Sequence, residues 1–251
     1  MSGMRTFRGN DKSHMKKKIS QQEAYKLGTD YQFIDSVKLG PWTSYSLLHD
    51  PKHIGFVLAR YKFCAKMLDG MDRVLEVGCG DGIGTPVIAQ AVKQVVAIEP
   101  DIRHIRGNRQ RLKKIKNVQF KAMSICDGVP EGQFDAAFSI DVIEHLDKPL
   151  NKSFLENQCA CLKEDGVCII GTPNITANKY ASPRSRVQHI NLQSQASLKK
   201  MMSKYFKRVF VFGMNDEVLH TGYASMCHYI FAVGVGVKQR GHINVSPSGF
   251  L

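Results

Sequence analysis

The chain has 251 residues, of which 43% are hydrophobic, so it can bury one good core and is expected to form a single domain with a small appendage. No stretch reaches the roughly 18 consecutive apolar residues that a membrane helix needs, which argues against a helical membrane span. Thirty-five lysines and arginines against 22 acidic residues give a net charge of +13, which favours anionic partners: nucleic acid, an acidic membrane or a phosphorylated small molecule.

The N-terminal third of the chain divides into a tail and a helical region. Residues 1–19 are basic with almost no apolar content, which predicts a disordered tail without the apolar core of a secretion signal. Residues 20–69 predict an N-terminal helical lid in two pieces, separated by "LGPWTSY" (39–45). The second piece starts at Asp50-Pro51, an N-cap followed by proline. The seven cysteines form no CxxC pair, so we expect reduced thiols and a cytoplasmic protein.

Residues 70–238 alternate between short apolar runs and helical stretches. The runs predict strands at 73–78, 94–100, 118–122, 134–140 and 166–173, with helices at 82–93, 101–115 and 148–163 between them. Buried parallel strands joined by crossover helices form a doubly wound, mostly parallel α/β sheet. After a loop (174–194) and a helix (195–206), strands at 208–213 and 228–235 follow one another without a helix, which predicts antiparallel strands at the sheet edge. Residues 239–251 are expected to be a C-terminal tail.

The glycine-rich loop "VLEVGCGDGIGT" (74–85) follows the first predicted strand, where a doubly wound sheet opens its ligand crevice. Glycines let the backbone turn tightly and approach a ligand closely. The dinucleotide pattern G-x-G-x-x-G/A fails, because its third position falls on Ile83 or, in the next register, on Thr85. A phosphate-binding P-loop fails as well, since no Lys-Ser/Thr pair follows the glycines. The pattern that fits is E-x-G-x-G-x-G, beginning at Glu76.

This pattern is similar to that of the class I S-adenosylmethionine (SAM) dependent methyltransferases, and the resemblance covers roughly residues 72–235. It implies a Rossmann-like methyltransferase fold in which the loop holds the amino-acid end and ribose of SAM. Glu99, about twenty residues beyond the loop at the end of "VVAIEPD", is then expected to accept both ribose hydroxyls. The adenine contact falls on Ser124 or Asp127, and the residues leave that choice open. The expected SAM-binding residues are Glu76, Gly78, Cys79, Gly80, Gly82, Glu99, Pro100, Ser124, Ile125, Asp127 and Asp141.

The stretch "SIDVIEHLDKP" (139–149) closes the fourth predicted strand and contains D-x-x-E-H, made by Asp141, Glu144 and His145. A carboxylate and an imidazole there could deprotonate an acceptor hydroxyl or bind a divalent ion that lowers its pKa. The stretch resembles ubiquinone-biosynthesis O-methyltransferases and, more loosely, small-RNA 2′-O-methyltransferases, in which E-x-x-E-H and a downstream histidine are metal ligands. The resemblance implies catalytic residues Asp141, Glu144 and His145, joined by His189 as ligands of an ion such as Mg²⁺. The alternative is that these side chains only line the SAM pocket.

The acceptor pocket is expected between the N-terminal helices and the loop after the fifth strand. The candidate substrate residues are Trp42, Tyr45, Tyr180, Arg184, Arg186 and His189. Two arginines suit a phosphate or carboxylate, so the sequence favours a small anionic acceptor. The segments "GPWTSYSLLHDPKH" and "GTPNITANKYASPRSRVQHINL" resemble bacterial surface-polysaccharide methyltransferases, including the group linked to capsule phosphoramidate. That resemblance implies O-methylation of a phosphorylated or sugar-linked compound.

Two other functions stay open. The basic stretch "RHIRGNRQRLKKIK" (103–116) is typical of a phosphate-backbone contact and would suit an RNA 2′-O-methyltransferase, although its apolar stripe also fits an ordinary solvated helix. The protein could also bind SAM without turnover. The sequence does not indicate an oligomeric state.

Overall fold

The computed structural model of the chain describes residues 19–29 and 36–238, so the two expected tails lie outside the described residues except for Ile19. The chain divides at Val37 into two compact units, and the first contains helix α1 (Gln21–Thr29). Ser20 and Glu23 exchange side-chain-to-backbone hydrogen bonds and form a capping box that begins this helix. All other elements belong to the second unit, which starts at Lys38.

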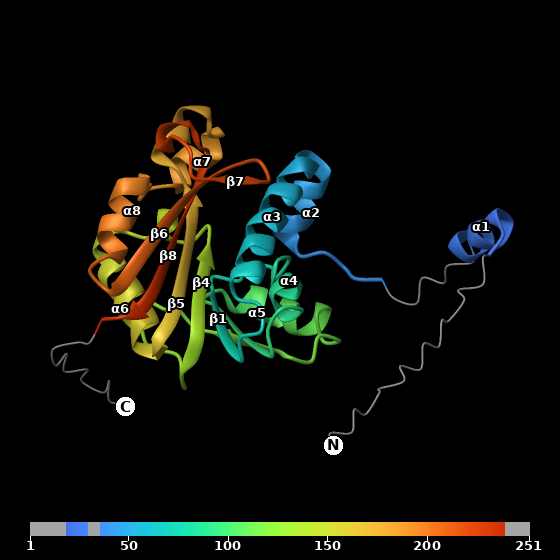
Figure 1. Cartoon of the computed structure of the whole chain (residues 1–251), viewed down its shortest axis with the longest axis horizontal. Helices are drawn as coiled ribbons and strands as arrows, with labels where there is room; N and C mark the ends of the chain where they lie inside the picture. Colours follow the sequence, from blue (N-terminus) through green and yellow to red (C-terminus); the bar gives the residue numbers. More distant parts are fainter. Residues whose placement is uncertain (1–18, 30–35, 239–251) are drawn as a thin grey trace, which may run out of the picture. The chain divides into compact units, whose positions relative to one another are not determined.

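The second unit is built on one mixed sheet that has eight strands among the described residues, in the order β3-β2-β1-β4-β5-β8-β6-β7 (Figure 1). The parallel part consists of β1 (Arg73–Val77), β2 (Gln94–Glu99), β3 (Val118–Ala122), β4 (Phe134–Ile140) and β5 (Leu162–Pro173). The antiparallel part consists of β6 (Phe206–Asn215), β7 (Val218–His220) and β8 (Tyr229–Val237), with β8 paired to β5. The expected doubly wound sheet with antiparallel C-terminal strands is therefore confirmed.

Helices cover both faces of this sheet (Figure 1). One face carries α3 (Pro51–Met67), α4 (Thr85–Ala89) and α5 (Ile102–Arg111), and α2 (Pro41–His49) packs against α3. The other face carries α6 (Asn151–Cys161) and α8 (Gln195–Met202). The layers are thus helices, sheet and helices, with a hydrophobic core on each side.

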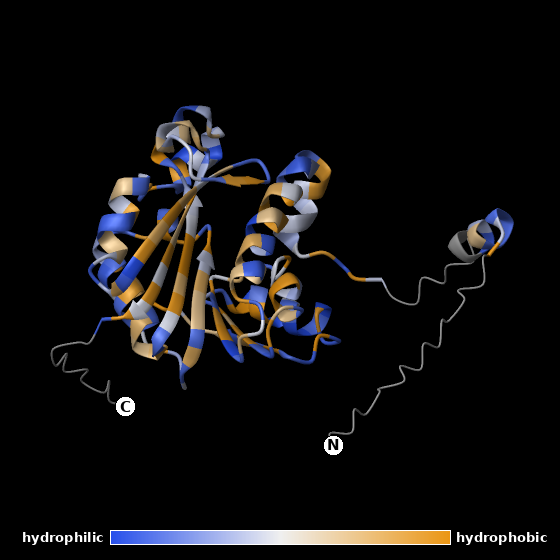
Figure 2. Ribbon diagram, viewed as in Figure 1, coloured by the Kyte–Doolittle hydropathy of each residue, from blue (hydrophilic) through white to orange (hydrophobic). Residues whose placement is uncertain are grey.

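Alternate residues of each central strand enter opposite cores. Val74 belongs to the core on the face that α3 and α4 cover, whereas Leu75 and Val77 belong to the core on the face that α6 and α8 cover. Since both faces of these strands are buried, their sequences are continuously apolar rather than alternating. Figure 2 shows the resulting hydrophobic colour along the inner strands.

Several expected boundaries are wrong. Residues 39–45 do not separate two helical pieces, because α2 begins at Pro41, a favourable first helical residue, and the break before α3 falls at Asp50. The helix expected at 82–93 shortens to α4, since glycine continues to Gly84. The expected loop 174–194 contains a 3₁₀ turn, η3 (Ile175–Tyr180), and α7 (Pro183–Gln188). The side chains of Asn174 and Ser182 cap these two elements. The short strand β7 was not expected.

The chain order reverses at the neighbouring strands β1 and β4, and a crevice in an open α/β sheet lies at the carboxyl ends of such strands. The glycine loop follows β1, Glu99 ends β2, the D-x-x-E-H stretch follows β4, and His189 lies beyond β5. Within residues 19–29 and 36–238, no helix combines the length and apolar character needed to cross a membrane.

Candidate active site

The glycine loop owes its path to backbone conformations that favour glycine. Gly78 and Gly80 have φ values of 76° and 50°. A Cβ atom on Gly78 would lie 2.4 Å from Cγ2 of Val142, so no side chain fits there. The backbone N–H groups of Gly78 and Cys79 both donate to the carbonyl oxygen of Ile98, at 2.9 and 3.1 Å. The loop therefore presents bare backbone at the carboxyl end of β1.

Glu99 links the tip of β2 to this loop. Its Oε2 accepts a hydrogen bond from the Gly80 N–H at 3.2 Å, and its Oε1 accepts one from the Asp101 N–H at 3.1 Å. Each carboxylate oxygen keeps a further lone pair. The carboxylate is thus held firmly beside the loop and can still accept hydrogen bonds from a diol. Pro100, the next expected cofactor residue, is exposed.

Helix α5 supports the loop from behind, through residues that the sequence did not single out. The amide of Asn108 donates to the carbonyl of Gly80 at 2.8 Å, and Arg111 donates to the carbonyl of Asp81 at 2.9 Å. Cys79 is 4% exposed, so its side chain packs inward and only its backbone faces the loop surface. Arg111 is therefore a structural donor rather than a free charge on the basic helix.

The segment after β3 holds the three residues expected near adenine. The hydroxyl oxygen of Ser124 accepts a hydrogen bond from the Cys126 N–H at 3.2 Å, and the Ile125 carbonyl accepts one from Asn157 at 2.7 Å. Ile125 is buried, Ser124 is half-buried and Asp127 is exposed. These contacts fix the turn without choosing between Ser124 and Asp127.

Asp141, directly after β4, has φ of 56°, an uncommon conformation for a residue other than glycine. Its Oδ2 is 2.7 Å from Nη1 of Arg60, and the Arg60 guanidinium lies 4.0 Å above the Tyr229 ring. Nε of Arg60, Oδ1 of Asp141 and the Tyr229 hydroxyl are buried and have no hydrogen-bond partner among the described residues. Three unsatisfied polar atoms in one place are typical of a ligand subsite. The signal for Arg60 was its position on the apolar face of α3, four residues before the buried Cys64.

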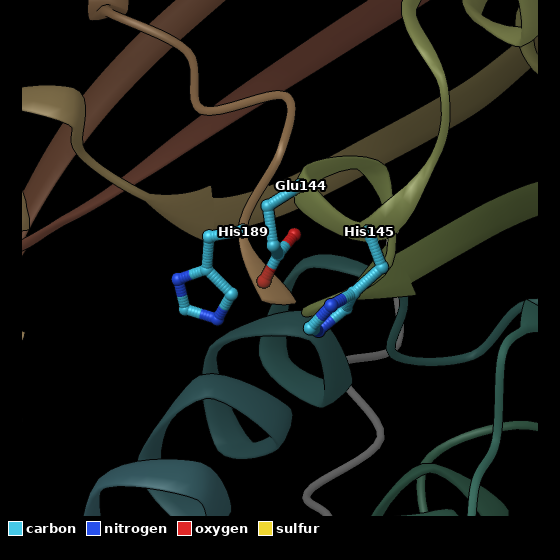
Figure 3. A group of neighbouring side chains, drawn as sticks. All are labelled: Glu144, His145 and His189. Atoms are coloured by element: carbon cyan, nitrogen blue, oxygen red, sulfur yellow. The ribbon is translucent and has the colours of Figure 1, made fainter. Parts of the chain in front are cut away.

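Glu144, His145 and His189 lie together (Figure 3), and one ligand atom from each lies within 4.8 Å of the others. Glu144 is fully buried in the 3₁₀ turn η1 (Ile143–His145), where its Oε2 accepts a hydrogen bond from the Thr172 hydroxyl at 2.9 Å. The two imidazole rings have centroids 5.0 Å apart. Asp141, the fourth expected metal ligand, is not in this group, because it pairs with Arg60.

The electrostatics of this group suit a cation. Burial, and secondarily the nearby Asp141 charge, raise the pKa of Glu144, whose Oε1 has no partner within the described part of the chain. Burial and the neighbouring His145 lower the pKa of His189, which favours a neutral ring. Nδ1 of His145 lies 3.2 Å from the Gln188 carbonyl, so a proton on Nδ1 leaves Nε2 free as a ligand. One carboxylate and two imidazoles therefore fit a divalent metal ion.

Next to His189 is a cavity of about 740 Å³. Its polar and aromatic lining comes from α3, from the segment after β5, from the β6–β7 turn and from the residue before β8. It includes Lys52, Phe56, Asn178, Tyr180, Ser185, Asp216, Glu217 and His228. Tyr180 and His189 are thus the two expected substrate residues that line it.

The other expected substrate residues lie outside this lining. Arg186 donates from Nε and Nη2 to the carbonyls of Ala181 and Lys179, at 3.0 and 2.9 Å. The Arg184 guanidinium lies 5.8 Å from the Tyr45 ring centroid, and Trp42 packs edge-on against His104. The arginines that suggested an anionic acceptor therefore have other contacts.

Comparisons with known proteins agree with this architecture. Residues 50–205 match the family described as "Methyltransferase domain", and the chain belongs to this family. A probable S-adenosylmethionine-dependent methyltransferase of Mycobacterium tuberculosis is 30% identical over 102 residues, covering 40% of this chain and 35% of that protein. A ubiquinone biosynthesis O-methyltransferase of Xanthomonas campestris is 30% identical over 113 residues, covering 43% of this chain and 46% of that protein. The chain thus spans less than half the length of these relatives.

Among solved structures, the N-methyltransferase NodS from Bradyrhizobium japonicum in complex with S-adenosyl-L-homocysteine has a similar fold. The TM-score is 0.56 at 19% identity, over 75% of this chain and 90% of that one. The resemblance to class I SAM-dependent methyltransferases that the glycine loop indicated is confirmed.

Proposed function

We propose that the protein is a SAM-dependent O-methyltransferase of a small hydroxyl-bearing acceptor. The observation that carries the proposal is the meeting of two groups at one edge of the sheet. The first is the glycine loop with Glu99, after β1 and β2. The second is the cluster Glu144, His145 and His189, after β4 and β5. The first group suits a sulfonium cofactor with a ribose, and the second suits the activation of a hydroxyl.

In the proposed cofactor site, the bare backbone at Gly78 and Gly80 admits the amino-acid end of SAM. Glu99 accepts hydrogen bonds from the two ribose hydroxyls with its remaining lone pairs. Arg60, whose Nε is buried without a partner in the described chain, is the cation that meets the cofactor carboxylate. The turn at Ser124 and Ile125 borders the adenine.

In the proposed reaction, the acceptor oxygen attacks the methyl carbon of the sulfonium. The new C–O bond forms as the C–S bond breaks, and the products are the methylated acceptor, S-adenosylhomocysteine and a proton. A divalent ion, when bound, would lower the pKa of the acceptor hydroxyl. Glu144 supplies one carboxylate oxygen for that ion while Thr172 orients the other. Two imidazole nitrogens favour a first-row transition-metal ion over the Mg²⁺ expected from the sequence, since Mg²⁺ prefers oxygen ligands.

The acceptor enters the cavity of about 740 Å³ beside His189. Within the described lining, Lys52 is the single residue that is a lysine or an arginine. The same lining contains two acidic residues, Asp216 and Glu217. We therefore propose a small polar acceptor such as a sugar-linked compound, whose acidic group, where it has one, meets Lys52. A compound of surface-polysaccharide metabolism would satisfy this description.

The test is S-adenosylhomocysteine release from purified protein with sugar phosphates, nucleotide-linked sugars, catechols and short RNAs. Each acceptor is assayed with EDTA and again after excess Mg²⁺, Mn²⁺, Co²⁺ or Zn²⁺. Turnover of a small molecule that EDTA stops and a transition-metal ion restores supports the proposal. Turnover that EDTA leaves unchanged contradicts the metal site. SAM binding without turnover of any acceptor would indicate a non-catalytic SAM-binding protein.

RNA 2′-O-methylation is a second candidate because of one surface groove. This groove, of about 520 Å³, lies between α5 and β3, and its lining includes Arg109, Lys113, Lys116 and Lys121 and no acidic residue. Arg109 is partly engaged, since its guanidinium donates to the Phe120 carbonyl. RNA binding that weakens steeply with salt, together with turnover on RNA alone, would favour this candidate.

A further inference from the structure

The carboxylate of Asp81, in the middle of the glycine loop, is committed to helix α2. Its Oδ2 accepts a hydrogen bond from the Thr43 N–H at 2.7 Å, and its Oδ1 accepts one from the Thr43 hydroxyl at 2.9 Å. Asp81 is 8% exposed and Thr43 is 6% exposed. Hydrogen bonds to an ionised carboxylate are roughly twice as strong as those between neutral groups.

These bonds replace a cap that α2 lacks. The N-cap residue of α2 is Gly40, which has no side chain to accept from the first backbone N–H groups. Thr43 is the third residue of the helix, the usual target of a capping side chain. Asp81 supplies that cap from a loop 38 residues further along the chain. Gly40 also leaves room for it, because a Cβ on Gly40 would lie 2.4 Å from Cβ of Asp81.

The same helix continues to the acceptor side. Trp42 packs edge-on against His104 of α5, with ring centroids 5.7 Å apart. One turn later, Tyr45 lies 5.8 Å from the guanidinium of Arg184 in α7. Helix α7 contributes Ser185 to the cavity lining and leads directly to His189. Helix α2 is therefore in contact with the cofactor loop at its start and with the acceptor-side segment further along.

We propose that Asp81 is a positioning residue that couples cofactor binding to the acceptor side. The loop around Asp81 has Gly80 and Gly82 at positive φ, and hydrogen bonds from Asn108 and Arg111 hold its carbonyls, so a ligand bound to this backbone acts on a segment that is already joined to α2. A cofactor that reduces the motion of the loop also restrains the Asp81 carboxylate. This carboxylate holds the first turn of α2, and α2 in turn contacts α7. SAM binding then strengthens acceptor binding, and by linkage the acceptor strengthens SAM binding by the same factor. The proposal rests on the proposed function in that the loop is taken to hold SAM.

Hydrogen–deuterium exchange of the full chain, with and without S-adenosylhomocysteine, tests this coupling. We expect the product to slow exchange about tenfold in peptides covering α2 and α7 as well as in the loop. In Asp81→Ala the loop should still be protected, and affinity for S-adenosylhomocysteine should stay within about threefold, since both carboxylate oxygens already accept hydrogen bonds from Thr43. Protection of α2 and α7 should fall to the ligand-free level, because a cap and a charged hydrogen bond are lost.

Two further variants complete the experiment. Thr43→Val keeps the shape and the backbone donor but removes the hydroxyl, so it should lose part of the α2 protection even where Asp81→Ala folds poorly. Asp165→Ala removes an exposed acidic charge from β5 and should behave as the wild type. The proposal is overturned where α2 and α7 are equally protected with and without ligand, or where Asp81→Ala keeps the ligand-induced protection. Loss of ligand binding in Asp81→Ala also overturns it, because Asp81 would then belong to the cofactor site. Failure of the wild type to bind S-adenosylhomocysteine would instead contradict the proposed function.

Discussion

Tyr61 of α3 donates its hydroxyl proton to Oε1 of Glu76, 2.9 Å away, just before β1 passes into the glycine loop. Tyr61 is 6% exposed and Glu76 is 1% exposed. Burial raises the pKa of Glu76 to about 7, with the nearby Thr85 hydroxyl and the hydrogen bond from Tyr61 acting in the opposite direction. The loop therefore begins beside a buried carboxyl group that changes its charge near neutral pH.

The first prediction concerns the pH dependence of stability. The folded pKa of Glu76 lies above its unfolded value of 4.5, so between about pH 4.5 and 7 the unfolded chain releases a proton that the folded chain retains. The contribution of Glu76 to the free energy of unfolding of the ligand-free protein should therefore fall as pH rises through this window and level off above it. The contribution of Glu76 is at most about 3 kcal/mol.

Urea unfolding of the wild type and Glu76→Gln at pH 5, 6, 7 and 8 measures this contribution as a difference. The variant carries an uncharged side chain of the same shape, so its stability relative to the wild type should rise from pH 5 to pH 8. Glu131→Gln, at an exposed position, serves as the control. A constant difference between Glu76→Gln and the wild type across these pH values would show that Glu76 does not titrate in this range.

The second prediction is that Glu99→Ala lowers affinity for S-adenosylhomocysteine at least a hundredfold. The variant would lose the two charge-assisted hydrogen bonds that we propose to the ribose, each contributing about 1.5–3 kcal/mol, and also the bond that holds Gly80. Isothermal titration measures the affinity, and circular dichroism checks that the fold persists. Glu131→Ala, an exposed glutamate elsewhere on the surface, should bind like the wild type. Unchanged binding in Glu99→Ala would contradict the ribose assignment.

The sequence predicted the central strands of the parallel sheet because both faces of these strands are buried, and each of them therefore contains a short, continuous apolar run. It also predicted the carboxyl-edge position of Glu99 and the D-x-x-E-H stretch, since these depend only on where a strand ends. The helix boundaries were less accurate: α2 depends on Asp81, which caps it from another part of the chain. Local sequence does not contain such a partner.

In the site, too, local sequence predicted some features, whereas contacts between distant residues determined others. His189 was expected beside Glu144 and His145 from a family resemblance, and the three lie together. Asp141 was expected there as well, but its partner is Arg60, which lies 81 residues earlier in the chain. Arg184 and Arg186 were expected to line the acceptor pocket, but neither lines the cavity. Sequence alone does not reveal that Arg186 donates to backbone carbonyls of its own segment. Contacts between distant segments decide these roles.

The third prediction concerns Arg60. Because its guanidinium is proposed to meet the cofactor carboxylate, Arg60→Ala should lower affinity for S-adenosylhomocysteine about tenfold or more. Affinity for 5′-methylthioadenosine, which lacks the amino-acid end, should change little. The comparison separates a carboxylate contact from general damage to the fold, since damage would weaken both ligands. Equal losses for the two ligands would contradict the assignment.

The fourth prediction concerns metal binding. Co²⁺ titrated into the metal-free protein should bind one site and give a visible absorption spectrum, which reports ligand geometry without any acceptor. His189→Ala removes one of the ligands and should weaken Co²⁺ binding about a hundredfold, and Glu144→Gln should do the same by removing the carboxylate.

The control for these variants is His49→Ala, an exposed histidine at the end of α2 that packs beside Tyr45 and lies outside the cluster. It should bind Co²⁺ like the wild type. Burial and the nearby Asp141 charge raise the pKa of Glu144, so the metal-free side chain retains a proton that a bound ion would displace. Wild-type-like Co²⁺ binding in both His189→Ala and Glu144→Gln would show that the cluster does not hold the ion. Glu144 would then be a buried carboxyl group that stays protonated.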